Sequence, residues 1–335
     1  MSRKIFKNHR LLFILVIILF TLSGSINILT ANGVQEKKEE IEITVAVFKG
    51  PSGIAATKLL GDNFQPGFNT KVNYIILGSP MEAVAKMTSG EVDAVFLPVN
   101  MAAKLYTKGP RFKLAAVSGL GSLYMVSTDN SIKNWFDLRG KTIYLTGKGA
   151  TPDYLLRYLL LENGLNPAED VKLDFSAQAP QIAQLMIAGR AETSFIPQPF
   201  VLQIETNSNV AKTVLDPQKE LLRIRGGKQA FPFTAFAISP KLYENRPEAA
   251  ASLIEALEKS ITWTLENPKE ASQIIENYGI MSAVIAKKAI PVSGIEFVSA
   301  AEAKESVEDF LKMMLDLDPV SVGGNLPDEG FYFSK

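Results

Sequence analysis

The sequence predicts a two-lobed α/β protein in which each lobe is a mostly parallel sheet flanked by helices and a ligand cleft lies between the lobes. Its 335 residues exceed what a single hydrophobic core usually serves. Segments with the pattern of strands alternate with short helical segments, which is typical of parallel sheets joined by helical crossovers. The same order of segments recurs about 100 residues later. A composition of 47% hydrophobic and 21% charged residues supports a packed core and argues against disorder.

The first copy of the pattern begins with a β-branched strand. Residues 41–48 (IEITVAVF) lead into the turn Lys49-Gly50-Pro51-Ser52-Gly53 and then into a helix. A second strand at 71–77 is followed by Ser79-Pro80-Met81-Glu82, a capping box with proline at the first helical position. A third strand is expected at 92–97.

The second copy repeats these segments in the same order. A strand at 141–145 (KTIYL) precedes a glycine-rich turn at 146–152 (TGKGATP), and an amphipathic helix is predicted over 180–188. Residues 90–98 (GEVDAVFLP) and 189–197 (GRAETSFIP) share their Gly, acidic, Phe and Pro positions, which makes four matches in nine. Two lobes of similar build explain this likeness. The alternative is that any unit of helix, glycine, strand and proline looks alike.

Two extended segments are expected to cross between the lobes. Residues 114–128 lead out of the first lobe, and residues 233–239 (FTAFAIS) lead back. The sequence then becomes helical, with an apolar face over 247–267 and a capped helix starting at Ser299, so no further α/β lobe begins. We therefore predict a hinged molecule that closes on a small ligand. Its first lobe comprises residues 41–126 and 236–335, and its second lobe comprises residues 127–235.

An N-terminal leader is expected over residues 1–33. Basic residues around His9 precede the apolar run 11–20, and small residues follow it, which is typical of a secretory signal peptide. An uncleaved N-terminal anchor is the alternative, because apolar residues resume at 26–29. The charged segment 34–40 is predicted to be a linker. Because the chain has no cysteine, a lipid anchor on a cysteine is not possible. The leader therefore predicts a periplasmic or other extracytoplasmic protein.

The residue content excludes several classes of function. Without cysteine, and with His9 in the leader as the single histidine, the exported chain has no thiol or imidazole for catalysis or metal binding. The glycine turn at 146–152 fits neither a Walker A loop nor a dinucleotide fingerprint. Thirty-five basic residues balance 35 acidic ones, which disfavours nucleic acid as a partner. We read Asp93 and Glu192 as turn anchors rather than as a catalytic pair.

Three segments, together with the leader, carry a resemblance to a known family: 49–59 (KGPSGIAATKL), 89–94 (SGEVDA) and 195–200 (FIPQPF). They resemble the substrate-binding proteins of nitrate, sulfonate and taurine-type ABC importers, whose superfamily includes proteins similar to the enzyme that makes the thiamine pyrimidine. The resemblance spans about residues 41–320. It implies a type II periplasmic-binding-protein fold and delivery of a solute to a permease in the inner membrane. One departure is Gln198, since the family often has Pro-Glu-Pro at this position.

Four loops are expected at the ligand, because small molecules bind beyond the carboxyl ends of strands in open α/β sheets. These loops are 49–53, 98–101, 147–152 and 197–200. Ser52 and Thr151 are predicted N-caps and candidate donors, and the glycines beside them are expected to leave amides open to an anion. The alternative for the hydroxyl and amide side chains is that they only cap their own helices or turns, and the alternative for the two lysines is that they are solvated. The candidate ligand-binding residues are Lys49, Gly50, Ser52, Gly53, Asn100, Gly147, Lys148, Gly149, Thr151, Gln198 and Phe233.

Two ligand classes remain open at this point. Helix starts rich in amides favour a sulfonate-like or nitrate-like anion, whereas aromatic residues near strand ends favour a heterocycle such as a pyrimidine or a thiamine precursor. We expect a monomeric solute-binding protein that works with a permease, with no cofactor, metal or catalytic residue. A thiamine-pyrimidine-synthase-like enzyme and a ligand sensor for a membrane receptor are the alternatives. The resemblance implies that such an enzyme contains histidine and cysteine. The enzyme is disfavoured because the exported chain has neither residue.

Overall fold

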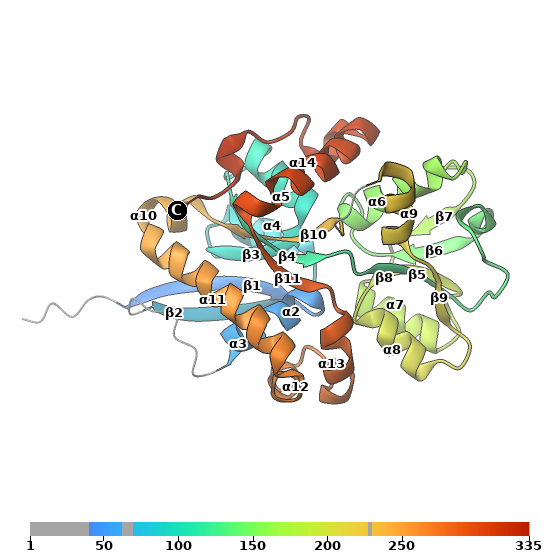
Figure 1. The fold of residues 1–335 in the computed structure, drawn as a ribbon, viewed down its shortest axis with the longest axis horizontal. Coiled ribbons are helices and arrows are strands. Elements are labelled where there is room, and N and C mark those ends of the chain that lie inside the picture. The colour runs from blue at the N-terminus through green and yellow to red at the C-terminus, as the bar shows by residue number, and fades with distance from the viewer. Residues whose placement is uncertain (1–39, 62–69, 227–229, 335) are drawn as a thin grey trace, which may run out of the picture. The chain divides into compact units, whose positions relative to one another are not determined.

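The computed structural model describes residues 40–61, 70–226 and 230–334. The predicted leader, and the predicted linker up to residue 39, lie outside the described residues. Residues 40–335 form one compact unit. Within its described part the strands form two sheets, with the orders β11-β4-β10-β3-β1-β2 and β7-β6-β8-β5-β9 (Figure 1). We call them sheet A and sheet B.

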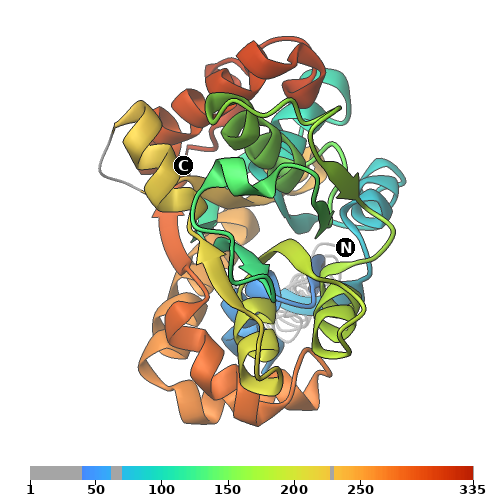
Figure 2. The same ribbon diagram turned by 90° about the vertical axis from the view of Figure 1, so that its right-hand side faces the viewer.

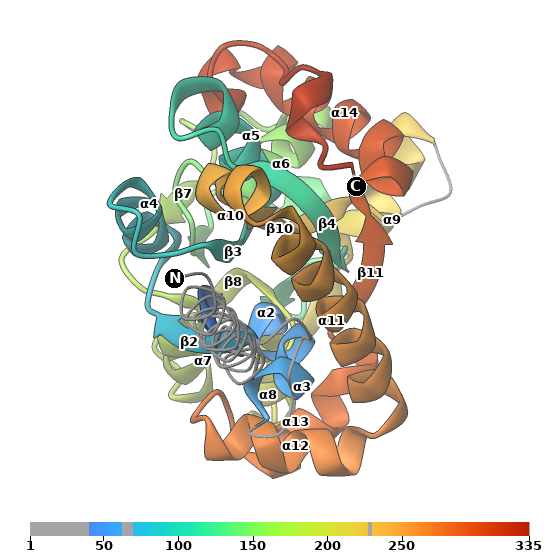
Figure 3. The same cartoon turned by 90° about the vertical axis from the view of Figure 1, so that its left-hand side faces the viewer.

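Sheet A is built from both ends of the described chain. Helices cover both of its faces: α11 packs against α2 and α3 on one side, and α5 and α14 pack against strands of the sheet on the other (Figures 1 and 3). Its strands are β1 (Ile41–Phe48), β2 (Thr70–Leu77), β3 (Ala94–Pro98), β4 (Lys113–Leu120), β10 (Pro232–Ile238) and β11 (Ile295–Ser299). The α-helices around it are α2 (Pro51–Ala55), α3 (Thr57–Leu60), α4 (Pro80–Thr88), α5 (Val99–Lys108), α10 (Pro240–Asn245), α11 (Pro247–Glu266), α12 (Pro268–Asn277), α13 (Ala283–Ala289) and α14 (Ala300–Leu317). Short 3-10 turns are η2 (Ile290–Val292), η3 (Pro319–Val322) and η4 (Glu329–Phe331).

Sheet B comes from the middle of the chain. It lies between α7 and α8 on one side and α6 on the other (Figures 1 and 2). Its strands are β5 (Leu123–Ser127), β6 (Thr142–Leu145), β7 (Lys172–Asp174), β8 (Thr193–Pro197) and β9 (Lys212–Leu215). The helices are η1 (Trp135–Leu138), α6 (Thr151–Glu162), α7 (Ala179–Ile187), α8 (Phe200–Asn207) and α9 (Pro217–Arg225).

The predicted internal repeat is confirmed by the pairing of the strands. In sheet A, β1 lies between β2 and β3 with parallel pairing, and β10 pairs antiparallel with β3. In sheet B, β6, β7, β8 and β5 have the same relations. The helices before β3 and β8 end alike, at Gly90 (φ 76°) and Gly189 (φ 68°), a backbone conformation that glycine adopts without strain. The likeness of 90–98 to 189–197 therefore reflects equivalent places in two lobes.

The fold class predicted from the sequence is confirmed, with one change. Each sheet is mixed, because the strands on the side of the interlobe connections, β10 and β4 in sheet A and β5 and β9 in sheet B, pair antiparallel with their neighbours. Only β10 and β5 follow connections between the sheets rather than helical crossovers, so nothing requires these two strands to run parallel to their neighbours. β4 and β9 follow α5 and α8 and run in the same direction as β3 and β8. The parallel expectation holds for β2-β1-β3 and β7-β6-β8.

The chain passes between the sheets twice. β4 ends at Leu120 and β5 begins at Leu123 in the other sheet, while the return runs through α9 to Pro232. The predicted boundaries at 126/127 and 235/236 fall inside β5 and β10. We therefore propose that the lobes meet at residues 121–122 and in the segment between α9 and β10.

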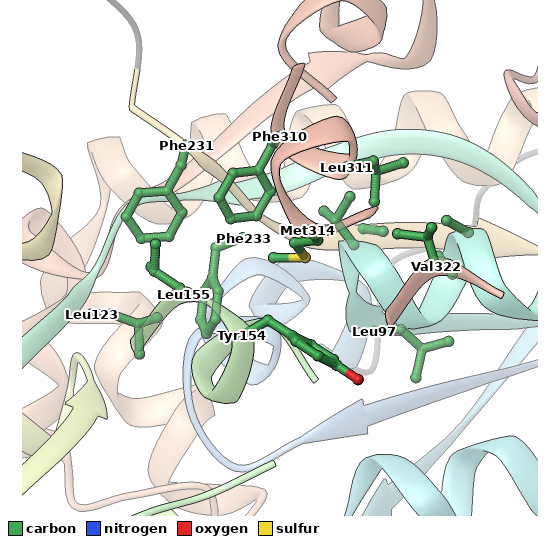
Figure 4. Packing of buried hydrophobic residues seen from close by; sticks show 14 of the residues in the cluster. Leu97, Leu123, Tyr154, Leu155, Phe231, Phe233, Phe310, Leu311, Met314 and Val322 are labelled. Atoms are coloured by element: carbon green, nitrogen blue, oxygen red, sulfur yellow. The ribbon is translucent and has the colours of Figure 1, made fainter. Parts of the chain in front are cut away.

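The C-terminal helix α14 packs on more than the first lobe. It contacts β4 and β10 of sheet A and also α6 of the second lobe. Phe310 of α14 stacks on Phe231 at a ring-centroid distance of 5.5 Å, and the same buried cluster contains Leu155 of α6 (Figure 4). This cluster joins the lobes through apolar contacts, and the Tyr154 hydroxyl adds a hydrogen bond to Asp318 at 3.2 Å. Burial first, and the Asp318 charge second, raise the pKa of Tyr154 to about 12.

Candidate functional site

A cavity of about 1240 Å³ lies between the two sheets. Residues at the carboxyl ends of strands from both lobes line it, including Phe48, Leu77 and Pro98 of sheet A and Thr146 and Pro197 on the side of sheet B. This is the place where open α/β sheets bind small molecules, because helices begin there and their first turns face the space. The remaining wall comes from α7 and from the segment before α13.

The first predicted loop reaches the cavity through two of its candidate residues. Lys49 and Ser52 line it, whereas Gly50 and Gly53 are not among the lining residues. The prediction that Ser52 is the N-cap of the following helix is wrong, because Gly50 holds that position and Ser52 lies inside α2. The Ser52 hydroxyl instead accepts a hydrogen bond from the Phe48 amide at 3.0 Å and donates to the Phe48 carbonyl. It therefore fixes the turn that presents Lys49.

The third predicted loop reaches the cavity through Gly147. Lys148 is exposed outside the lining, and Gly149 does not line the cavity. The expectation of an open amide at Gly149 is wrong, since this amide donates to the Asp153 carboxylate at 2.8 Å. Asp153 is itself buried and pairs with Arg157. A carboxylate of the chain thus occupies the anion position at the start of α6.

A hydrogen bond between Thr151 and Asn100 links the two lobes outside the cavity lining. The N-cap of α6 is Ala150, so the prediction of Thr151 as the cap is wrong by one residue. The Thr151 hydroxyl donates to Asn100 Oδ1 at 3.1 Å, and Asn100 Nδ2 donates to the carbonyls of Gly149 and Ser321 at 3.2 and 3.0 Å. Both side chains are fully buried and neither lines the cavity. Both polar atoms of the Asn100 side chain therefore bond groups of the protein itself.

The last two candidates differ in position. Gln198 is buried outside the lining, and its Oε1 accepts a hydrogen bond from Leu202 at the start of α8, which is turn chemistry. Phe233 of β10 lines the cavity beside Thr234. Of the candidate residues, the structure brings Lys49, Ser52, Gly147 and Phe233 together around one space.

Several lining residues are absent from the candidate set. The loop after β2 contributes Gly78 and Pro80, although the strand-end rule applied to the other loops predicts it equally well. The flank of α7 contributes Gln184 and Leu185, and the loop after β7 contributes Gln178. The comparison of 90–98 with 189–197 contained a signal for a further residue, Arg190, which stands where the first copy has a glutamate.

The charges around the cavity have one sign. Lys49 of the first lobe and Arg190 of the second are among the described lining residues, and none of these residues is Asp or Glu. No ion pair of either cation occurs within the described part of the chain. Both side chains are exposed, and a cavity with cations on two walls has a positive potential that attracts an anion.

Prolines mark the helix starts that line the cavity. Each stands in the first turn of its helix: Pro51 of α2, Pro80 of α4, Pro152 of α6 and Pro180 of α7. The positive dipole ends of α2, α4 and α7 border the space, whereas Asp153 already takes the anion position at the start of α6. At all four helix starts the prolines replace amide donors with apolar rings. Phe48, Phe96 and Phe200 extend this apolar lining. The site therefore combines positive potential with a largely apolar wall.

The described residues contain no group of three or more His, Cys, Asp or Glu side chains placed to hold a metal ion. Among the helices that the structure describes, none is long and apolar enough to cross a membrane.

Comparison with known proteins places the chain in a family. Residues 49–289 match the family model described as ABC transporter, phosphonate, periplasmic substrate-binding protein. The chain belongs to this family. It is therefore the periplasmic substrate-binding component of an import system, not an enzyme, and it binds a small ligand and works with a permease. No curated protein matches the sequence.

Solved structures agree with this fold, and one of them, at 30% identity, also agrees with the family. The crystal structure of an ABC transporter protein from Parabacteroides distasonis is 30% identical, with a TM-score of 0.74, over 89% of this chain and 100% of that one. The alkanesulfonate-binding protein SsuA from Xanthomonas axonopodis pv. citri, bound to MOPS, is 14% identical, with a TM-score of 0.63, over 86% and 94% of the two chains. The nitrate-binding protein NrtA from Synechocystis PCC 6803 is 17% identical, with a TM-score of 0.62, over 85% and 84%. The resemblance stated from the sequence is confirmed.

Proposed function

We propose that the protein captures an organic oxyanion, a sulfonate or phosphonate that carries an apolar group, and delivers it to the permease. The observation that carries this proposal is the cavity lining, in which Lys49 and Arg190 face the space from opposite lobes without a carboxylate among the described lining residues. A sulfonate or phosphonate is retained by such cations and by the positive ends of the surrounding helices.

The size and polarity of the cavity support an organic rather than a bare anion. Small-molecule sites usually enclose about 300–1,000 Å³, and about 1240 Å³ is available here. A nitrate ion leaves most of this space to water, against walls formed by side chains such as Phe48, Phe200 and Ile285. An apolar group on the ligand covers these walls and gains about 25 cal/mol per Å² of apolar surface buried. The matching family model is described as phosphonate-binding, and one of the similar structures is an alkanesulfonate-binding protein. Both descriptions are consistent with this chemistry.

The proposal includes the remaining expectations from the sequence. The leader 1–33 directs export, the protein acts as a monomer with one permease, and it needs no nucleic acid or cofactor. The candidate residues that line the cavity, Lys49, Ser52, Gly147 and Phe233, form part of the site.

The experiment is a thermal-shift and calorimetric titration of the purified protein. Hexanesulfonate and hexylphosphonate are the main probes, methanesulfonate and nitrate test the apolar requirement, and cytosine tests the heterocycle class. Binding only to the native state stabilises it by about 2.7 kcal/mol at 100 times Kd, so the hexyl anions are expected to raise Tm while nitrate does not. A shift with cytosine and none with either hexyl anion contradicts the proposal.

A matched pair of variants tests the cations. Lys49→Gln combined with Arg190→Gln is expected to weaken hexanesulfonate binding at least 10-fold. Lys148→Gln is the control, because this lysine lies in an equivalent glycine turn but outside the lining. Equal affinity of the double variant and the control removes the basis for an anionic ligand.

A further inference from the structure

Two consecutive residues of β10, Phe233 and Thr234, line the same cavity. Neighbouring residues of a regular strand point to opposite faces of the sheet. The pairing of β10 with β4 is irregular here, with register shifts on both sides of Thr234. Irregularities of this kind re-aim a side chain and are common beside binding sites. On its other side Thr234 pairs regularly with Pro98 of β3, and β10 begins at the edge of the cavity, so both Phe233 and Thr234 line the same space.

The Thr234 side chain fits under the cavity because its neighbour lacks a side chain. A Cβ atom at Gly119 on β4 would stand 3.1 Å from Thr234 Oγ1 and 3.4 Å from its Cβ. Any larger residue at that position presses on the threonine. Thr234 is about nine-tenths buried, at 9% exposure, and forms part of the cavity floor.

The hydroxyl of Thr234 differs from the other hydroxyls of the lining. Ser52 bonds the backbone of Phe48, and Thr146 donates to Gln178 at 2.9 Å. Ser282 is exposed to solvent. Within the described part of the chain the Thr234 hydroxyl makes no hydrogen bond, and it does not belong to the fully enclosed hydroxyls without a partner, so it is accessible from the cavity. A ligand that covers this hydroxyl shields it from water, so a ligand that supplies a hydrogen-bond partner is favoured over one that does not.

We propose that Thr234 is a specificity-determining residue whose hydroxyl donates a hydrogen bond to an oxygen of the bound oxyanion. The inference rests on the proposed function, since it requires an oxyanion in the cavity. The cations on the two walls attract the charge from a distance, whereas a fixed hydroxyl on the floor selects ligands whose oxygen reaches it.

The test compares three variants by calorimetric titration with hexanesulfonate. Thr234→Val keeps the shape and removes the hydroxyl, and Thr234→Ser keeps the hydroxyl. Thr264→Val is the control, because Thr264 is fully buried in α11, lies outside the lining and also has a hydroxyl without a partner in the described residues. We expect Kd to rise about 10-fold or more in Thr234→Val, to change less than about threefold in Thr234→Ser, and to stay unchanged in Thr264→Val.

Unfolding of the ligand-free variants separates binding from structure. The Thr234 hydroxyl makes no hydrogen bond to the described part of the chain, so its removal is expected to leave Tm unchanged or to raise it, and Thr234→Val is expected to fold as well as the wild type. A Tm lowered in parallel with the loss of affinity marks a structural role and overturns the inference. So does wild-type affinity in Thr234→Val. If the wild type binds neither hexanesulfonate nor hexylphosphonate, the proposed function fails, and the inference fails with it.

Discussion

Replacement of Asn100 tests whether this residue serves the fold or the ligand. The side chain is fully buried at the start of α5 and makes three hydrogen bonds to groups far away in the sequence. Two of the partners, Gly149 and Thr151, belong to the second lobe, and the third, Ser321, belongs to the C-terminal segment. Asn100→Ala removes all three bonds at the junction of these parts.

The expected loss follows from the number of bonds. A net contribution of about 1 kcal/mol for each bond gives about 3 kcal/mol, and the buried carbonyls and hydroxyl left without Asn100 raise the total to about 3–5 kcal/mol. For a chain of this size a loss of 1 kcal/mol lowers Tm by about 2 °C, so Asn100→Ala is expected to lower Tm by about 6–10 °C. Asn100→Asp costs at least as much, because it buries a charge and turns an acceptor toward the carbonyls of Gly149 and Ser321.

The assay is thermal unfolding by circular dichroism at pH 7 without ligand, followed by titration with hexanesulfonate. Asn207→Ala on α8 is the control, since Asn207 is exposed and makes one bond to the carbonyl of Gln203 within its own helix. Its Tm is expected to change by less than about 1 °C. An Asn100→Ala variant with wild-type Tm and strongly weakened binding refutes the reasoning, because it assigns the amide to the ligand as the sequence alone predicted.

Two further predictions concern the acid limit of stability and the glycine turn. The hydrogen bond from Lys141, with help from Ser131, lowers the pKa of Asp129, so the carboxylate stabilises the fold above its unfolded pKa of about 3.8 and this contribution disappears as pH falls further. Asp129→Asn is therefore expected to lower Tm at pH 7 and to approach the wild-type Tm below pH 3.8, and a difference that is constant with pH in a Tm series contradicts this. Gly53→Ala is expected to destabilise by about 1–3 kcal/mol in urea unfolding, because its Cβ would lie 2.9 Å from both the Phe48 carbonyl oxygen and Ile280 Cδ1. Gly78→Ala is the control, because its Cβ would lie 3.6 Å from its nearest neighbour, the flexible side chain of Glu82. Equal stability of the two variants counts against the steric argument.

The sequence predicts those elements whose cause is local. The predicted strand at 41–48 and the long helix at 247–267 agree with β1 and α11 to within one residue, because periodicity and burial coincide there. The predicted capping box at Ser299 is confirmed in full, since its hydroxyl accepts from the Glu302 amide and the Glu302 carboxylate accepts from the Ser299 amide. At Ser79 the serine half of the box forms, whereas Glu82 bonds Gly78 instead.

Residues whose side chains have several possible roles could not be assigned from the sequence. Ser52, Thr151 and Asn100 carry side chains that serve equally as helix caps, ligand donors or links between distant segments. The choice depends on what the fold brings near them, and for Asn100 the decisive partner Ser321 is 221 residues away. The strand-end rule selects the correct edge of each sheet, but it does not say which residues of a loop face the cavity.

The two lobes are alike in their strands and differ at the residue that follows the glycine before β3 and β8. In the first copy Gly90 is followed by Glu91, which pairs with Lys86 at 2.8 Å on the helix before it. In the second copy Gly189 is followed by Arg190, which lines the cavity. The same backbone turn thus supports a local ion pair in one lobe and a charge at the cavity in the other. Because the turn needs only its glycine, the following residue is free to differ, and in a duplicated fold such differences point to function more directly than the matches do.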